Sequence, residues 1–441
     1  MRQNIRIMLL IGLIAVLITN SACQATPAQD VVVNKSDDFF EKLTESTDAF
    51  YAAPDTVEQQ ANIHGLDIKF NAKVVMPIST GFRVVEIEQT HFTIDDCKRF
   101  MDYFEPGATW IQQPVDTKAD VRYRMFRIEN SSRFEEYEKK EYRRTYVDEL
   151  EVAPESVEFV PANMDTFSES KVTPIWSLHE DGSRSFFSMR LSGDNALYKR
   201  SVESGIYQRD NFSTRDIEYN DFNEDPSISE TAALKIAQKA MDDLHLAPEL
   251  TLLSAEKGIA YQFREPVARG WLLMYTRMNG GLQAPYDFFG YVVWDASPAP
   301  SHVGPWDQEA LLVFVDDEGI YCFDLRGAGR EVKKLYDNVQ LLPFSELLER
   351  IQAQLVYQHS YHDESIESVE VQVNKISLVS SLIDIADQPG YGLLIPSWKV
   401  EYRLTLTYKD KEAGTDELDL STMFNAVDGS YIEPRKTRDI E

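Results

Sequence analysis

Two segments of the chain alternate apolar and polar residues, and this alternation constrains the fold more than any other feature. In Leu66–Met76 every even-numbered residue is apolar and nearly every odd-numbered one is polar, and Trp398–Tyr408 repeats the pattern. Successive side chains of a strand point to opposite faces, so each segment is expected to bury one face and to expose the other. One solvated face is typical of antiparallel sheets, and we predict that both segments lie in such sheets.

The C-terminal half contains two segments with helical spacing. Ser227 and Glu230 form the S-x-x-E pattern of a capping box, and the apolar residues of Ser229–Leu246 recur at intervals of three and four. The spacing of apolar residues predicts a second helix over Phe344–Leu355.

Apolar runs that resemble strands follow each of these helices. Asp428–Gly429 indicates a type I′ hairpin turn between the last two strands, and Asp316–Gly319 indicates another tight turn. We therefore predict an α+β fold with antiparallel meander sheets, each packed by a helix. The repeated order suggests two similar units, at residues 225–342 and 343–441.

Residues 56–224 are expected to form a separate N-terminal α+β domain. Phe82–Glu88 follows Gly81, which suggests a hairpin with Leu66–Met76. A helix is predicted over Asp95–Phe104, and a second hairpin is predicted over Ile175–Ser192.

Asp116–Val152 is the most highly charged stretch and contains no Pro or Gly. Its acids and bases are interleaved at helical spacing, which favours a solvated helix held by i,i+4 pairs. A basic stripe for an anionic ligand is the alternative, through Lys139, Lys140, Arg143 and Arg144.

The N-terminus has the organisation of an export signal. Arg2 and Arg6 precede the apolar run Ile7–Ile18, which is closed by small and polar residues up to Cys23. Twelve helical residues span only about 18 Å, which is too short for a membrane-spanning helix. We predict a signal peptide over residues 1–22, followed over residues 23–55 by a tether and a short helix near Asp37–Asp48.

Cys23 is expected to receive a diacylglycerol, because it follows Ser21 and Ala22 directly after the apolar run, as in bacterial lipoprotein signals. Asn20 departs from the aliphatic residue usual at its position. Ordinary cleavage after Ala25 or Ala28, which would leave a freely secreted protein, is the alternative.

Short motifs along the mature chain resemble an uncharacterised lipoprotein family of Gram-positive gut bacteria, a domain of unknown function. These are VVVNKSDDFFEKL, FNAKVVMP and FNAVDGSYI. In the C-terminal half, SETAALKIAQKAMDDL and LIPSWKVEYRL are similar to PepSY-like and related envelope-regulatory domains. The latter resemblance implies a non-enzymatic module that inhibits peptidases or modulates sensor kinases, and neither resemblance implies a catalytic residue.

Charge and motifs exclude several classes of function. The net charge of −29 repels phosphate backbones, so no nucleic-acid partner is expected. The common motifs of nucleotide-binding proteins, serine hydrolases and zinc peptidases are missing from the sequence. We expect no catalytic, cofactor-binding or metal-binding residue, and the one site that we predict is the lipidation site at Cys23.

Two weak metal-like clusters are interpreted as structural. His359, His362, Asp363 and Glu364 offer suitable zinc ligands, but they lie at the end of a predicted helix, where His is favoured by the helix dipole. Asp384 and Asp387 precede Pro389–Gly390 and are interpreted as part of a loop. A calcium site is not predicted there, because calcium needs more oxygen ligands than these two carboxylates supply.

Cys97 and Cys322 are expected to be small buried residues, although a disulfide between them remains open.

Aromatic residues surround the Pro-rich segment DASPAPSHVGPW and suggest either core packing or a ligand platform. They are Trp271, Tyr275, Tyr286, Phe288, Phe289, Tyr291, Trp294 and Trp306. Most of them alternate along predicted strands, which favours the core.

The expected function is that of an exported, lipid-anchored and non-catalytic surface protein that binds a protein or peptide partner in the envelope. The alternatives are a solute- or glycan-binding lipoprotein and a surface hydrolase. The expected location is the extracytoplasmic face of the cell membrane, or outside the cell if the protein is not anchored.

Lipidation can be tested by the substitution Cys23→Ala. We expect the variant to leave the membrane fraction and to lose labelling by a fatty-acid analogue, because the thiol is the acceptor. Undiminished labelling of the variant would refute lipidation at Cys23.

Overall fold

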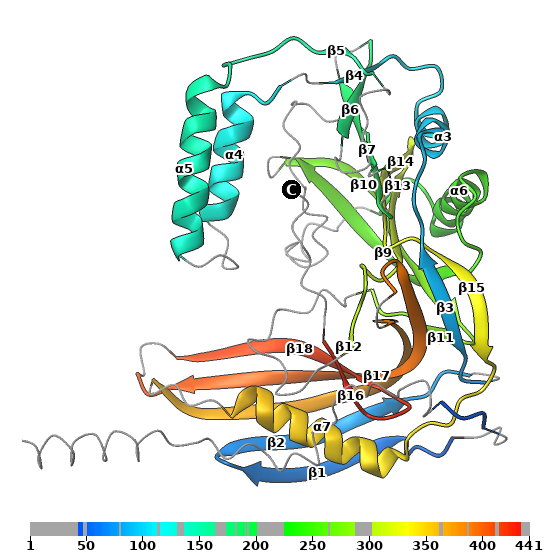
Figure 1. Ribbon diagram of the computed structural model, residues 1–441, viewed down its shortest axis with the longest axis vertical. Helices are drawn as coiled ribbons and strands as arrows, with labels where there is room; N and C mark the ends of the chain where they lie inside the picture. The colour runs from blue at the N-terminus through cyan, green and yellow to red at the C-terminus, as the bar shows by residue number, and fades with distance from the viewer. Residues whose placement is uncertain are drawn as a thin grey trace, which may run out of the picture.

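The computed structural model describes most of the chain beyond residue 42. The described residues are 43–46, 51–78, 81–112, 115–129, 136–163, 173–180, 183–189, 191, 194–200, 225–262, 265–286, 302–360, 365–385, 388–410 and 414–433. They form five helices and two sheets, one of nine strands and one of ten (Figure 1). The predicted α+β class with largely antiparallel sheets is confirmed.

The nine-stranded sheet combines strands from both ends of the chain. Its main strand order is β1 (Thr56–Ile63), β2 (Leu66–Val75), β16 (Ile366–Asp384), β17 (Tyr391–Tyr408), β18 (Thr415–Asn425), β19 (Tyr431–Glu433) and β12 (His302–Val303). Strands β3 (Val84–Gln89) and β15 (Gly329–Tyr336) pair with each other, and β3 also pairs with β17. Neighbouring strands are antiparallel except β2 with β16 and β12 with β19, which are parallel.

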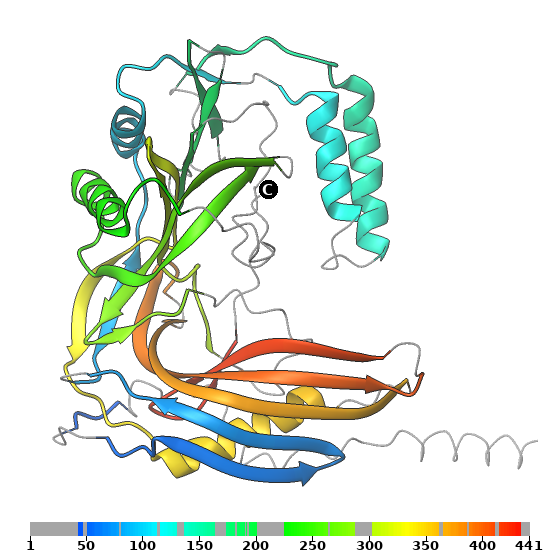
Figure 2. The ribbon, with the colours of Figure 1, turned by 180° about the vertical axis from the view of Figure 1, so that it is seen from behind.

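Helix α7 (Phe344–His359) covers the apolar face of this sheet. Residues of β2 and β17 are buried there against the helix in the predicted alternation, including Leu66, Ile68, Phe70, Trp398, Val400, Tyr402, Leu347, Ile351 and Leu355. The opposite face is polar, with Lys69 Nζ 2.6 Å from Glu370 Oε2 and Lys375 Nζ 2.9 Å from Glu401 Oε2. In Figure 2 the strands lie in front of α7.

The ten-stranded sheet forms the other half of the molecule. Its order is β11 (Leu282–Gln283), β10 (Glu265–Asn279), β13 (Ala310–Asp316), β14 (Gly319–Arg326), β8 (Ala196–Lys199), β7 (Arg184–Met189), β6 (Thr173–Leu178), β4 (Trp110–Gln112) and β5 (Val160–Pro161). Strand β9 (Leu250–Gln262) pairs with β10. The β6–β7 and β13–β14 pairs confirm two predicted hairpins.

Helices α3 (Ile94–Phe104) and α6 (Glu230–Asp243) pack on one face of this sheet (Figure 1). The alanines Ala233, Ala237 and Ala240 of α6 are fully buried, and they let the helix approach the sheet closely. The predicted helix Ser229–Leu246 is confirmed, but its cap is Ser229, whose hydroxyl accepts from the Ala232 N–H, and not Ser227. Ser229 stands directly before the first helical turn, where a side-chain oxygen can reach a free backbone N–H.

Helices α4 (Lys118–Glu129) and α5 (Glu136–Val152) form a hairpin that projects from the rest of the molecule (Figures 1 and 2). Ion pairs cross between them, such as Arg124 with Glu149 at 2.9 Å and Arg143 with Glu129 at 2.9 Å. The charged stretch is therefore helical, as its spacing predicts, and is divided into two helices.

Two local predictions, a hairpin after Leu66–Met76 and a type I′ turn at Asp428–Gly429, are wrong. Strand β3 makes no hairpin with β2, because the two edges of β2 are taken by β1 and β16. β1 folds back onto β2 through His64 and Gly65, which both have positive φ (52° and 83°), as a type I′ turn requires. At Asp428–Gly429 only Gly429 has positive φ (73°), and the loop is longer, with the Asn425 N–H donating to Ser430 O.

The short helix near Asp37–Asp48 lies largely outside the described residues, and its described part is not helical. Leu43 is buried in the core under the nine-stranded sheet, and Glu45 forms an isolated antiparallel bridge with Val339. Tertiary pairing with Val339 thus replaces the local helical preference of this segment.

The chain does not form a separate sheet from residues 56–224. Strands β1 to β3 belong to the nine-stranded sheet, whereas β4 to β8 belong to the ten-stranded sheet. Strand β15 lies within the expected unit of residues 225–342, but it pairs with β3 and belongs to the nine-stranded sheet, which also contains β16 to β19. Each sheet is completed by strands from distant parts of the sequence.

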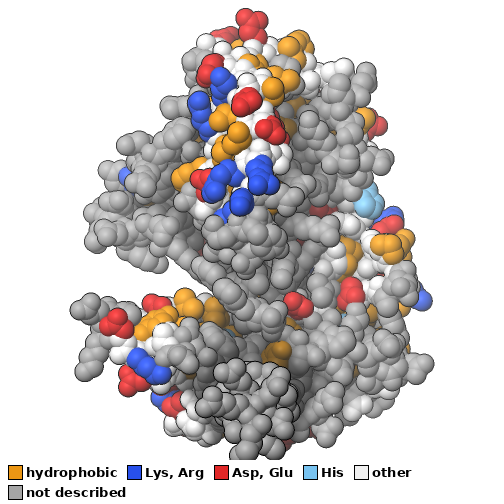
Figure 3. Space-filling view, turned by 60° about the vertical axis from the view of Figure 1, so that its left-hand side comes forward, with side chains coloured by type: hydrophobic (Ala, Val, Ile, Leu, Met, Phe, Trp, Pro, Cys, Tyr) orange, Lys and Arg blue, Asp and Glu red, His pale blue; other side chains and the backbone are white. Residues whose placement is uncertain are grey.

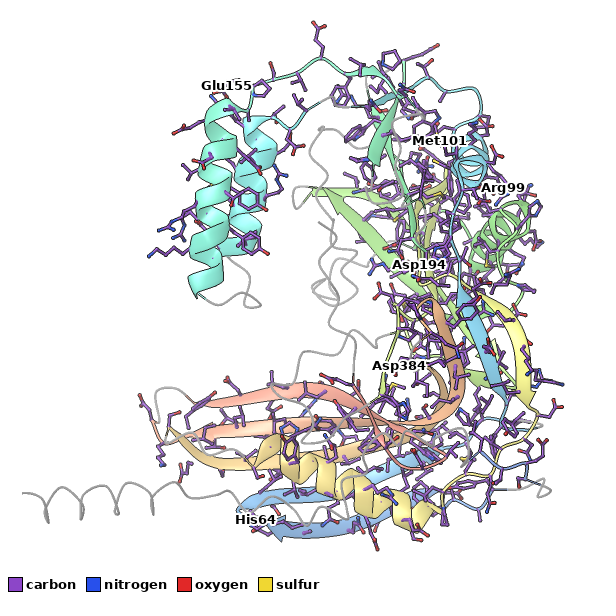
Figure 4. All side chains as sticks on the ribbon, viewed as in Figure 1. His64, Arg99, Met101, Glu155, Asp194 and Asp384 are labelled. Atoms are coloured by element: carbon purple, nitrogen blue, oxygen red, sulfur yellow. The ribbon has the colours of Figure 1, made fainter. Side chains whose placement is uncertain are left out.

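A buried ion pair marks the junction of the two sheets. Arg277, near the end of β10, donates from Nε to Glu309 and from Nη2 to Gly329 O at 2.5 Å. Glu309 Oε1 accepts from the Gly329 N–H at 3.3 Å, and Glu249 Oε2 lies 3.5 Å from Arg277 Nη1. Burial raises the pKa of Glu309, and the Arg277 guanidinium opposes this shift. Figure 4 labels Asp194 and Asp384 close to the same junction.

Breaking this pair is expected to be costly. Arg277→Met should lower the free energy of unfolding by about 3–5 kcal/mol, because it leaves the Glu309 carboxylate buried without its partner. Arg277→Met combined with Glu309→Leu should regain part of the loss, measured by urea denaturation.

A matched control is Lys239→Met, which removes the exposed pair of Lys239 with Asp243. Exposed pairs contribute at most about 1 kcal/mol, so the control should stay close to the parent. Equal losses in the two single variants would contradict a special role for Arg277.

Candidate functional site

A groove of about 610 Å³ lies between α6 and the beginning of β9. Its lining comes from a flank of α6, from the start of β9 and from the loop between them. Its lining residues are Thr231, Leu234, Lys235, Gln238, Met241, Asp242, Leu246, Ala247, Pro248, Leu250, Thr251, Leu252 and Tyr275. The groove is partly apolar and partly polar, as expected of a binding site for a ligand that is itself amphipathic.

The local sequence explains why the groove forms. The buried alanines of α6 draw its middle onto the sheet, whereas the larger Leu234 and Met241 border the groove. Helix α6 ends at Asp243, and His245 has a positive φ of 57°, which turns the chain. Pro248 follows, and β9 begins two residues later beside the helix.

Tyr275 forms part of the floor of the groove. It projects from β10 and is only 4% exposed, and burial raises the pKa of its hydroxyl to about 12. The hydroxyl has no hydrogen-bond partner in the described part of the chain, although it lines the groove. It therefore remains a proton donor at neutral pH that is available to an acceptor on a ligand.

The polar groups around the groove suit binding better than catalysis. Lys235 and Asp242 are the charged residues among the described lining, and the Asp242 carboxylate already accepts from Gln238 Nε2 at 2.9 Å. A hydrolytic site needs a nucleophile beside a base, and this lining offers no such pair. Thr231 adds a hydroxyl to the lining, whereas the Thr251 hydroxyl already donates to Thr276 O at 3.5 Å and accepts from Gln283 Nε2 at 3.3 Å.

The strand wall of the groove is also an edge of the ten-stranded sheet. Among the described strands, β9 pairs with β10 and with no other. The register of this pair shifts between Met274 and Tyr275, which leaves one residue of β9 bulged. Leu252 and Leu253, at the bulge, are each 40% exposed.

A second polar cluster lies at the end of α3 and contains residue types found in hydrolases. Ser185 Oγ is 2.9 Å from His179 Nε2, and Glu105 Oε1 is 3.6 Å from the same nitrogen. A catalytic triad needs the acid on the other ring nitrogen, and Ser185 is fully buried. Tyr198 donates to Glu105 at 2.8 Å, so the cluster anchors the end of α3 to β8.

The structure describes only some residues of the two metal-like clusters. His359 Nε2 lies 3.0 Å from the Tyr402 hydroxyl in the core, while His362, Asp363 and Glu364 lie outside the described residues. Asp384 is 4.0 Å from His302 Nδ1 at the junction, and Asp387 is not described. Within the described ranges, His, Cys, Asp and Glu do not gather in a group that could hold a metal ion.

The aromatic residues near the Pro-rich segment do not form one platform among those described. Trp306 is buried against Val85 and Ile87, whereas Trp271 donates from Nε1 to Ile228 O near the start of α6. Phe288, Phe289, Tyr291 and Trp294 lie outside the described residues.

The two described cysteines are buried, and the basic residues of α4 and α5 lie among acidic ones. Cys97 and Cys322 are both free and buried, and burial raises the pKa of the Cys97 thiol to about 12. Figure 3 shows Lys and Arg side chains beside acidic and apolar ones on the forward side of the molecule, where α4 and α5 project. Arg143, one of the residues of the alternative basic stripe, is paired with Glu129 at 2.9 Å.

Cys23 and the preceding signal lie outside the described residues. No helix in the described ranges combines the length and the apolar character needed to cross a membrane.

Comparisons with known proteins give no family for the chain. No protein-family model matches it, and no curated protein matches it. It is similar to the crystal structure of an uncharacterized protein from Eubacterium rectale, at 13% identity over 86% of this chain and 93% of that chain, with a TM-score of 0.41.

The groove was not found from the sequence. Ser229–Leu246 and Trp271–Tyr275 are both visible there as apolar segments, but nothing in their spacing shows that α6 and β9 border a common space. Leu252 and Leu253, two adjacent leucines that follow the predicted helix, are the one signal that could have indicated an exposed apolar surface, and no strand is predicted there.

The buried His359 predicts a pH dependence of stability. Burial lowers its pKa from 6.5 to about 4, so below pH 6.5 the unfolded chain binds a proton that the folded protein excludes. Stability should therefore be complete above pH 6.5 and be lost as the pH falls toward 4, by about 2–3 kcal/mol from this residue.

Urea denaturation of the parent and of His359→Gln at pH 7.5 and 4.5 measures this contribution. The parent should lose more stability than the variant over this interval, because Gln does not titrate. Equal losses would mean that His359 is not held neutral in the core.

Proposed function

We propose that the protein is exported, is anchored by lipid on Cys23 to the extracytoplasmic face of the cell membrane, and binds a protein or peptide partner there without catalysing a reaction. The proposed location is supported by the N-terminal signal pattern and by Cys23. The binding role is supported by the groove between α6 and β9, whose lining is apolar and hydrogen-bonding.

The exposed groups of the groove carry this proposal. Leu252 is 40% exposed and lines the groove together with Leu234 and Leu246, and large apolar side chains grouped at a surface hollow are typical of interaction sites. The Tyr275 hydroxyl supplies a directional contact at the floor, where water is largely excluded. Fixed polar groups among apolar ones give specificity as well as affinity.

The proposal can be tested by placing a photo-crosslinker at the groove. Lys235→Cys and Glu349→Cys each create an exposed thiol, the first at the groove and the second on α7. The native Cys97 and Cys322 are buried, so a benzophenone maleimide should label the introduced thiol of the folded mature protein. The labelled proteins are irradiated with the envelope fraction of the producing cells.

We expect a discrete cross-linked protein product from position 235 and at least tenfold less from position 349. Adding Leu234→Glu should abolish the product, because a buried charge would oppose apolar contact in the groove. Similar products from both positions, or a product unchanged by Leu234→Glu, would count against the groove as the binding site.

A further inference from the structure

The backbone of β9 has hydrogen-bonding groups directed away from the sheet next to the groove. The Met278 N–H donates to Glu249 O at 2.8 Å across the β9–β10 pair, so Glu249 faces β10. In an antiparallel pair, residues alternate between facing the partner strand and facing away. Leu250 and Leu252 therefore direct their backbone groups outward, and Arg277, opposite Leu250, correspondingly bonds to Ala284 on its other side.

Of these two residues, Leu252 is the one whose N–H is not bonded within the preceding turn. The Leu250 N–H is taken by Ala247 O at 3.1 Å, in the turn that precedes the strand. By this alternation the backbone N–H and C=O of Leu252 point away from β10, and among the described strands β9 pairs with no other. The side chain of Leu252 lines the groove. A backbone donor and acceptor thus stand at the wall of a partly apolar groove.

From this geometry we infer that the groove binds a peptide segment in extended conformation, which adds to the outer edge of β9 at Leu252 and inserts an apolar side chain between α6 and the strand. This inference rests on the proposed binding function and specifies its partner. An extended peptide has unpaired N–H and C=O groups on both sides, which match the outward groups of Leu252.

The side walls fit the same ligand. Alternate side chains of an added strand point to one face of the sheet, so one residue of the peptide can enter the groove toward Leu234, Met241 and Leu246. The Tyr275 hydroxyl at the floor can donate to a carbonyl or side-chain oxygen of the peptide. A compact helical or sugar ligand would leave the Leu252 backbone unpaired.

The test uses random heptapeptides displayed on phage and selected on the folded mature protein. The most enriched sequence is synthesised with a fluorophore, and its affinity is measured by fluorescence anisotropy. Leu252→Pro removes the outward N–H at an edge position where proline can be tolerated, and Leu252→Ala keeps the N–H but shortens the side chain.

We expect Leu252→Pro to bind at least tenfold more weakly than Leu252→Ala. Tyr275→Phe should weaken binding about threefold to tenfold, the effect of one lost hydrogen bond. The exposed Leu178, which lies on β6 away from the groove, provides the control Leu178→Ala, which should bind like the parent.

Hydrogen exchange of the unmodified protein provides a measurement that does not depend on the folding of a variant. Amide exchange at Leu252 should slow at least tenfold when the peptide is added, because its N–H gains a partner. No enriched peptide, equal affinity of the Pro and Ala variants, or unchanged exchange at Leu252 would overturn the inference. A groove that still cross-links a partner in that case would uphold the proposed function and exclude strand addition as its mode.

Discussion

The buried pair of Arg277 and Glu309 is the contact on which the relation of the two sheets depends. Arg277 lies near the end of β10, two residues after Tyr275, and it also reaches Gly329 at the start of β15 and Glu249 just before β9. A buried guanidinium needs several hydrogen-bond acceptors, because removing an unpaired charge from water costs much free energy. The same side chain therefore links the sheets and positions both the floor and the strand wall of the groove.

The groove follows from an unequal distribution of side-chain size on α6. Alanines bring the helix close to β10 and β13, whereas the larger Leu234 and Met241 line the groove beside the edge strand. A helix beside an edge strand leaves both apolar surface and backbone groups within reach of one ligand. This combination suits recognition of an extended chain, and it needs no titratable group with a catalytic role.

The sequence was most informative where a pattern has only one structural solution. Trp398–Tyr408 could bury its apolar residues only as a strand, and Ser229–Leu246 only as a helix, and both predictions are confirmed. The partners of strands were less predictable, because β2 could have paired with β3 as well as with β16. The candidate site escaped detection for the same reason, since Tyr275 in a buried strand looks like any core aromatic residue.

By itself, the sequence determined the α+β class, the helices and the solvated faces of the strands, since these depend on periodicity within short segments. It also contains the signal pattern around Cys23, which can be recognised without any knowledge of the fold. The tertiary structure decided how strands from residues 56–199 divide between two sheets, where Arg277 meets Glu309, and which edge of β9 remains open. These features depend on contacts between residues far apart in the chain, and local periodicity contains no information about such pairings.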